Sequence, residues 1–285
     1  MASDQPRSTS TGIIETPGNR RLSQVALLLL LSGRTGAADF RRRYTWRTWI
    51  LGWLARGILE VLFFASIGAM LQDPQVTLYL VIGRSLLIGA TETMLAIQTV
   101  GWERQDGTMP FLLIGTAPAW PAFVGRALQW LPSATATPLL LLFVLGPILG
   151  LRYDLESALI TAVAVPLCAL SSFGFSMAVA AAVIVWPAAR NLVANVAAAT
   201  IALFCGAFVP VSHWPEAVQG MAQVVPLTHI IDTVTSALLN HDASSAVWRF
   251  ALAFGLGAAW LLVGIFLLER FVERGRRTTV SHPDD

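Results

Sequence analysis

Six long apolar segments dominate this sequence and leave few folds open to it. Each is about as long as the roughly 20 residues that an α-helix needs to cross the hydrocarbon core of a bilayer. Only 13% of the residues are charged, about half the share of an ordinary soluble domain. The sequence therefore predicts an all-α membrane protein with six transmembrane helices. The expected spans are residues 49–71, 76–99, 129–149, 157–185, 191–211 and 247–268.

The distribution of arginine indicates how these spans are oriented. All nineteen basic residues are arginine, and fifteen of them fall in segments that share one side of the membrane. Only Arg152 and Arg249 fall on the other side, while Arg56 and Arg84 lie within spans. Positive charge accumulates in cytoplasmic segments. We therefore expect a multi-pass protein of the plasma (inner) membrane with both termini in the cytoplasm.

The region ahead of the first span has two parts. Residues 1–19 are rich in Ser, Thr, Gly and Pro and are expected to form a disordered cytoplasmic tail. The apolar run that follows, residues 22–31, is too short to cross a bilayer, so we expect an N-terminal cytoplasmic interfacial helix leading into the first span. A secretory signal is the alternative, but its cleavage would leave the basic run 41–43 outside. The expected organisation is one membrane domain over residues 20–270 and a cytoplasmic C-terminal tail over 271–285.

Two loops are long enough to have functions of their own. The loop after the second span lies in the cytoplasm and is interpreted as a polar lead-in (102–106), a short helix (107–115) and a return to the bilayer (116–126). Pro110 bears on this division, because proline favours the first turn of a helix. The external loop 212–246 is too apolar to be fully solvated. It is expected to form short re-entrant helices packed against the bundle between the fifth and sixth spans.

Four ionisable residues lie within the first two spans, where charge is costly unless it is paired. Arg56 and Glu60 are four residues apart on one helix, and Arg84 and Glu92 lie on the next. Their depths, at 1.5 Å per residue, predict two ion pairs between antiparallel helices, Arg56 with Glu92 and Glu60 with Arg84. The favoured interpretation is a structural charge clamp. A polar substrate path or a proton path is the alternative.

Several kinds of chemistry find no support in the sequence. Without lysine there can be no phosphate-binding loop of the GxxxxGK[ST] type and no lysine nucleophile. Cys168 and Cys205 lie in apolar segments and are interpreted as packing residues, and the histidines lack the spacing of metal ligands. No GxSxG or HExxH pattern occurs. We therefore expect no catalytic or metal site, and no nucleic-acid partner.

Motif residues occupy both long loops in a characteristic order. The cytoplasmic set is Glu103, Arg104, Gly107, Thr108, Leu112, Leu113 and Pro118, and the external set is Gly206, Pro210, Pro215, Pro226, Thr228, His229 and Asp232. Together with the six-span layout, these motifs resemble those of type-2 ABC transporter permeases. The sequence departs from the family pattern at Met109-Pro110, at Arg126, where lysine is usual, and at His229, where an aromatic residue is usual.

The resemblance implies a transmembrane subunit of an ATP-driven exporter. In that family two permease subunits, as a homodimer or with a paralogue, associate with two copies of a cytoplasmic ABC ATPase, which binds ATP and Mg²⁺. The cytoplasmic motif would form a coupling helix that docks on the ATPase, and the external helices would close the outer end of the path. No cofactor is expected on this chain itself.

The mostly apolar spans suit a hydrophobic or amphipathic cargo, such as a drug, a metabolite or a lipid-linked molecule. Membrane lipids are expected partners of the basic N-terminal region. Two alternatives remain: a membrane-embedded enzyme, either a lipid-modifying enzyme or a protease, and a membrane assembly factor that transports nothing.

Overall fold

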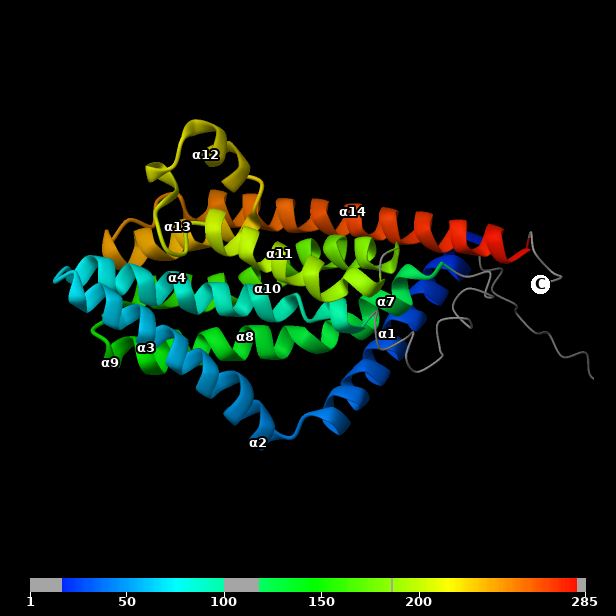
Figure 1. Ribbon diagram of the computed structural model, residues 1–285, viewed down its shortest axis with the longest axis horizontal. Helices are drawn as coiled ribbons and strands as arrows, with labels where there is room; N and C mark the ends of the chain where they lie inside the picture. Colours follow the sequence, from blue (N-terminus) through cyan, green and yellow to red (C-terminus); the bar gives the residue numbers. More distant parts are fainter. Residues whose placement is uncertain (1–16, 100–117, 186, 281–285) are drawn as a thin grey trace, which may run out of the picture.

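The computed structural model describes residues 17–99, 118–185 and 187–280, and this part of the chain is helical, without a strand (Figure 1). The prediction of an all-α membrane protein is confirmed. Five helical segments are long and apolar enough to cross a membrane. They run from Trp46 to Met70, Pro74 to Thr99, Trp120 to Ile148, Leu155 to Val183 and Ala246 to Arg274.

Several of these segments combine more than one type of helix. The first comprises α2 (Trp46–Trp49), the π-helical η1 (Ile50–Leu54) and α3 (Ala55–Met70), and the second begins with α4 (Pro74–Thr93). The third comprises α7 (Trp120–Ala127), η2 (Leu128–Trp130), α8 (Leu131–Leu140), η3 (Leu141–Leu145) and α9 (Gly146–Ile148). The fourth is α10 (Leu155–Val185) and the fifth is α14 (Ala246–Val280).

The expected span over residues 191–211 is wrong in its length. After the 3₁₀ turn η4 (Pro187–Ala189), helix α11 (Arg190–Phe204) has 15 residues and is about 22 Å long, short of the roughly 30 Å hydrocarbon core. The chain turns at Gly206, whose φ of 82° lies in the left-handed region that glycine tolerates. Apolar character continues through Phe208 and Val209, which is why the sequence predicted a longer helix.

The external segment forms short helices, as predicted. The 3₁₀ turn η5 (Val211–His213) precedes α12 (Glu216–Ala222), and α12 meets α13 (Pro226–Leu239) at a bend of 96°. Helix α13 is largely buried and packs against α4, α10 and α14. If the bent pair is taken as one span, the structure has six candidate membrane crossings.

Helices extend into both stretches that were expected to be tails, and the division into one membrane domain and two tails stays a prediction. Helix α1 (Pro17–Arg43) begins inside the stretch interpreted as the N-terminal tail, and α14 continues to Val280, well past residue 270. The third span begins at Trp120 instead of residue 129, so the return from the cytoplasmic loop is part of the same helical rod.

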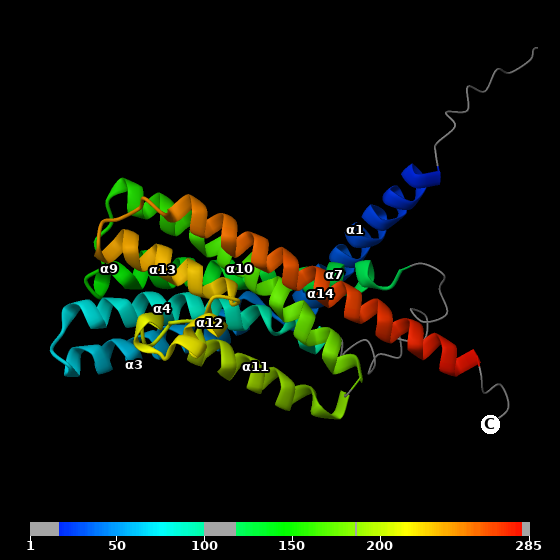
Figure 2. The same cartoon turned by 90° about the horizontal axis from the view of Figure 1, so that it is seen from above.

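Helix α4 forms the centre of the bundle. It packs against α3, α8, α10 and α13 (Figure 2). Most of its side chains from Leu80 to Thr93 are buried. The first and last spans are mostly exposed on their outer faces, where large apolar side chains such as Leu59, Phe63 and Leu262 suit contact with lipid. Segments attached to α4 are therefore the ones most firmly placed in the bundle.

Candidate functional site

The cytoplasmic motif falls mostly on residues that the structure does not describe. Glu103, Arg104, Gly107, Thr108, Leu112 and Leu113 lie outside the described residues, as does the expected helix over 107–115. Pro118 is described: it is exposed and lies two residues before α7. The described part of this site is therefore α7, through which the chain leaves the cytoplasmic loop.

Two polar contacts hold α7 between the first and last helices. The backbone N–H of Trp120, at the start of α7, donates a hydrogen bond to Oε1 of Glu269 on α14 at 2.8 Å. Arg126, near its end, forms an ion pair with Asp39 on α1, with 2.7 Å between Nη2 and Oδ2. At Gly36 a Cβ atom would lie 2.8 Å from the carbonyl oxygen of Arg126, so α1 and α7 are in close backbone contact. A displacement of α7 must therefore involve α1, α14 or both.

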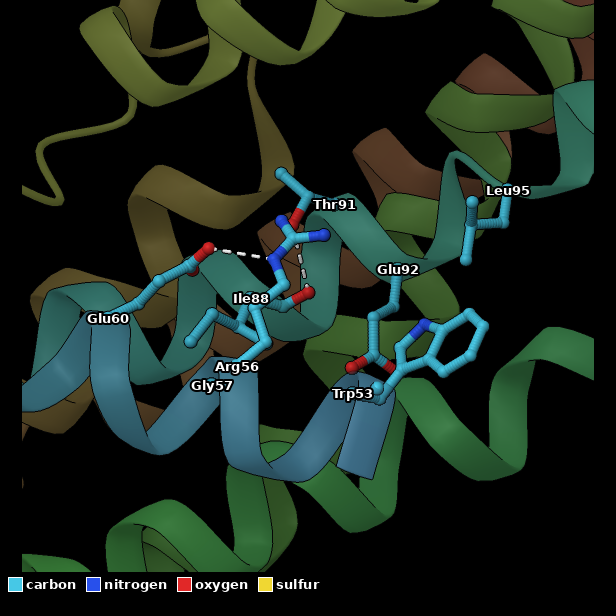
Figure 3. Close-up of a pocket in the computed structure, with 9 residues that line it drawn as sticks. Trp53, Arg56, Gly57, Glu60, Ile88, Thr91, Glu92 and Leu95 are labelled. Atoms are coloured by element: carbon cyan, nitrogen blue, oxygen red, sulfur yellow. Dashed lines mark hydrogen bonds and ion pairs between the residues drawn. The ribbon is translucent and has the colours of Figure 1, made fainter. Parts of the chain in front are cut away.

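The intramembrane charges form a cluster around Glu60 (Figure 3). Nε of Arg56 donates to Oε1 of Glu60 at 2.8 Å, and Nη2 of Arg84 binds Oε2 of the same carboxylate. The structure thus contains the cross-helix pair of Glu60 with Arg84. The expected ion pair of Arg56 with Glu92 is not formed, because Arg56 binds the carboxylate on its own helix instead. Glu60 consequently serves two arginines and ties α3 to α4.

Glu92 is held by neutral donors rather than by an arginine. It is 6% exposed, and its Oε2 accepts a hydrogen bond of 2.6 Å from Ser133 Oγ on α8. Ser133 Oγ in turn accepts a 2.7 Å hydrogen bond from the indole Nε1 of Trp49. A comparison of depths along the first two spans could not identify Ser133 as the partner of Glu92, because Ser133 lies on the third span. Glu92 therefore links α4 to α8 and, through Ser133, to α2.

A cavity of about 250 Å³ separates the two parts of this polar cluster. Its lining includes Trp53, Arg56, Glu60 and Glu92, so it lies between α3 and α4 (Figure 3). Glu60 is bound by Arg56 and Arg84, and Glu92 accepts a hydrogen bond from Ser133, so the geometry is that of a clamp between helices with a small polar pocket inside it.

The first part of the external motif lies against the outer half of α4. The hydroxyl of Tyr79 donates to the carbonyl oxygen of Gly206. A Cβ atom at Gly83 would lie 2.2 Å from the carbonyl oxygen of Ala207, so glycine is required for this contact. The guanidinium of Arg84 also lies 5.9 Å from the ring of Phe208. Neither Tyr79 nor Gly83 was recognised from the sequence, although an aromatic hydroxyl inside a span is a signal for a buried hydrogen bond.

The second part of the external motif gathers at the bend between α12 and α13. Pro226 is the first residue of α13, where its missing N–H costs nothing. The hydroxyl of Thr228 donates to the carbonyl oxygen of Ala222 at 2.8 Å. Nε2 of His229 lies 3.0 Å from the carbonyl oxygen of Gln223. Both side chains thus satisfy carbonyls at the end of α12.

The other members of the external motif are spread along the segment. Pro215 precedes α12, and Asp232 lies one turn further along α13, half-buried. Pro210 precedes the turn η5. The structure therefore does not bring the whole motif to one point: Gly206 lies against α4, while Thr228 and His229 lie at the bend.

A central buried span, polar ties between spans and an external pair of short helices together define a polytopic membrane domain. The sequence profile of the ABC-2 type transporter family matches residues 38–239, more than two thirds of the chain. The chain therefore belongs to the ABC-2 type transporter family and is a transmembrane subunit of an ABC transporter. Comparison with curated proteins finds no significant match. Domains of this family are transport subunits and are generally not enzymes themselves.

Proposed function

We propose that this chain is the membrane half of an ATP-driven exporter, with both termini in the cytoplasm and with hydrolysis on a separate ATPase. The observation that supports this proposal is the way α7 is held. The segment expected to dock on the ATPase leads directly into α7, and α7 is tied to α1 by Asp39 and to α14 by Glu269. A push on the loop would therefore reach several helices together.

The proposed mechanism is a rigid-body change between two packings of the spans. Helix α4 enters the cytoplasmic loop and α7 leaves it, so closure of the ATPase subunits would tilt both. At the other end of α4, the Gly206 carbonyl bound by Tyr79 would move with the helix. In this proposal the external segment closes the path at rest and opens when α4 tilts.

The assembly in this proposal has two permease subunits and two ATPase subunits, with ATP and Mg²⁺ bound by the ATPase. Family membership implies the ATPase partner. The cargo is proposed to be hydrophobic or amphipathic, such as a drug, a metabolite or a lipid-linked molecule. The large apolar side chains exposed along the described spans support this, and the carboxylate of Glu60 is already bound by Arg56 and Arg84.

The proposal is tested with the permease and its ATPase reconstituted in liposomes, by measuring ATP hydrolysis and cargo transport in parallel. Asp39→Asn removes the charge from one tie to α7 and Glu269→Ala removes the other tie, and a charge-assisted hydrogen bond contributes roughly 1.5–3 kcal/mol. We expect transport per ATP hydrolysed to fall while the ATPase still co-purifies. Glu156→Gln, an exposed carboxylate in the first turn of α10, is the matched control and should leave the ratio unchanged.

The docking segment is tested separately through complex formation. Substitution of Glu103 or Leu112 by alanine should reduce co-purification of the ATPase, since these residues are proposed to contact it directly. If both variants retain the ATPase and its full hydrolysis rate, the coupling assignment is wrong. If Asp39→Asn and Glu269→Ala transport like the parent protein, α7 is not the route by which force enters the bundle.

A further inference from the structure

A narrow aromatic crevice lies where α1 meets the first span. The two helices form a V whose apex is at α2, standing away from the centre of the bundle (Figure 1). The crevice has a volume of about 270 Å³ and is bounded by Phe40 and Tyr44 from the end of α1, Trp46 and Trp49 from α2, and Ala136 from α8. Its lining is predominantly apolar, and it is distinct from the cavity between α3 and α4.

The inner wall of the crevice is held in place by ring contacts. The ring of Tyr44 lies 5.1 Å from that of Phe40 and 4.8 Å from that of Trp53, edge to face in the second case. Phe40 makes a further edge contact, at 5.5 Å, with the buried Trp130. Burial raises the pKa of the Tyr44 phenol, so this wall carries no negative charge at neutral pH. Aromatic contacts of this kind favour a preformed crevice over one that opens only on binding.

The surroundings of the crevice are strongly basic. Arg41, Arg42 and Arg43 form the last turn of α1, and Arg47 follows on α2. Between residues 40 and 59 the sequence contains no acidic residue. At the rim the guanidinium carbon of Arg47 lies 5.5 Å from the ring of Trp46, a side chain that is 69% exposed. A ligand that fits here must therefore combine an anionic group with an apolar body.

Two nearby carboxylates are already engaged with other side chains. Asp39 is bound to Arg126 on α7, and Glu92 lies behind Ser133, whose hydroxyl donates to it. Trp46 is also the first residue of the first candidate span, which places the crevice at a membrane boundary. Tryptophan and arginine at such a boundary meet the lipid phosphates and the upper part of the acyl chains.

We propose that this crevice is a binding site for an anionic phospholipid. The phosphate lies against Arg47 at the rim, and the glycerol and first acyl carbons enter between Trp46, Trp49 and Ala136. This site is separate from the cargo path and does not depend on the exporter function. Charge complementarity selects an anionic headgroup, and the depth of the crevice at the bilayer boundary selects a lipid rather than a soluble anion.

The test uses the full chain in an uncharged detergent, titrated with brominated phosphatidylglycerol or brominated phosphatidylcholine. Bromine quenches tryptophan fluorescence on contact, and Trp46 and Trp49 line the crevice. We expect saturable quenching by phosphatidylglycerol that phosphatidylcholine does not reproduce. Arg47→Gln should weaken the phosphatidylglycerol affinity about fivefold, the effect of roughly one arginine at an anionic membrane surface.

Two further variants separate the crevice from general charge. Ala136→Leu fills the crevice without changing any arginine and should abolish the saturable component. Arg270→Gln is the matched control, because Arg270 also stacks on an aromatic ring, that of Phe266 at 4.9 Å, but does not line this crevice. Equal quenching by the two lipids overturns the proposal, as does an equal loss of affinity in Arg270→Gln and Arg47→Gln. If Ala136→Leu does not fold, the two arginine variants still decide the outcome.

Discussion

Helices α10 and α14 form the most extensive helix pair of the described bundle, and glycine makes their approach possible. A Cβ atom at Gly174 would lie 2.0 Å from the carbonyl oxygen of Gly257, and one at Gly257 would lie 2.5 Å from Cα of Ser171. Gly255, only two residues away on α14, would place a Cβ atom in open space. Gly174→Ala and Gly255→Ala therefore make the same chemical change in two opposite environments.

The expected size of the effect follows from these distances. An ordinary contact between carbon and oxygen needs more than about 3.3 Å, so Gly174→Ala forces α10 and α14 apart by roughly 1 Å. Overpacking of this kind costs about 1–3 kcal/mol. Alanine in place of glycine also gains up to about 1 kcal/mol of helix propensity, but this gain is common to both variants. The difference between Gly174→Ala and Gly255→Ala therefore reports the packing cost alone, about 1–3 kcal/mol.

The assay is thermal unfolding of the purified full chain in a mild detergent. At roughly 2–4 °C per kcal/mol for a chain of this size class, the midpoint of Gly174→Ala should lie about 2–12 °C below that of Gly255→Ala. Gly255→Ala itself should match the parent protein or exceed it slightly. If the two alanine variants unfold at the same temperature, α10 and α14 do not approach as closely as described.

Two further outcomes are expected. Glu60→Gln should lower the unfolding temperature more than Arg56→Gln, because only the first change leaves Arg84 without its carboxylate inside the span. Breaking a buried pair costs roughly 3–5 kcal/mol. Equal losses in the two variants would contradict the shared role of Glu60. Hydrogen bonds from the side chain and backbone of Ser157 hold the pKa of Asp154 below its ordinary value of 3.8. The ionised carboxylate of Asp154 therefore supports the first turn of α10 above pH 3.8, and this support is lost as the pH falls through the lowered pKa. Amide hydrogen exchange in that turn should accelerate only in this acidic range, and Ser157→Ala should shift the change to higher pH.

Segment length and apolar content were enough to predict where most of the chain crosses the membrane. They failed for the stretch 191–211, because hydrophobicity reports where a segment lies and not whether its backbone stays helical. The missing information was conformational: Gly206 adopts a positive φ and Pro210 follows it, so the chain remains apolar while leaving the helix at Phe204. The same Gly206 and Pro210 belonged to the motif that carried the family resemblance, so the signal for the break was present in the sequence.

The intramembrane charges show a second limit. Depth along two antiparallel helices matched Glu60 with Arg84 and Arg56 with Glu92, but depth does not state which direction a side chain faces around the helix axis. In the structure Arg56 reaches Glu60 on its own helix, and Glu92 accepts a hydrogen bond from Ser133 on α8. Contacts between sequentially distant spans depend on the arrangement of the whole bundle, which residue spacing within two helices cannot supply.

The contacts of α4 connect these separate features along a single helix. Near its outer end Tyr79 and Gly83 hold the segment at Gly206, and further along Arg84 holds Glu60 on α3. About two turns later Glu92 is bound to α8 through Ser133, and the second span then ends at Thr99.

Because α4 is buried and tied at each of these levels, it cannot easily bend to absorb a displacement applied at its cytoplasmic end. A displacement of the loop is therefore more easily accommodated by tilting α4 as a unit, and such a tilt would carry the external segment with it. This mechanical argument makes Gly83 a critical position for transport even though it is remote from the loop. Gly83→Ala should impair the movement of cargo in the reconstituted complex more than it impairs association with the ATPase, and an equal loss of both would show only that the bundle is misfolded.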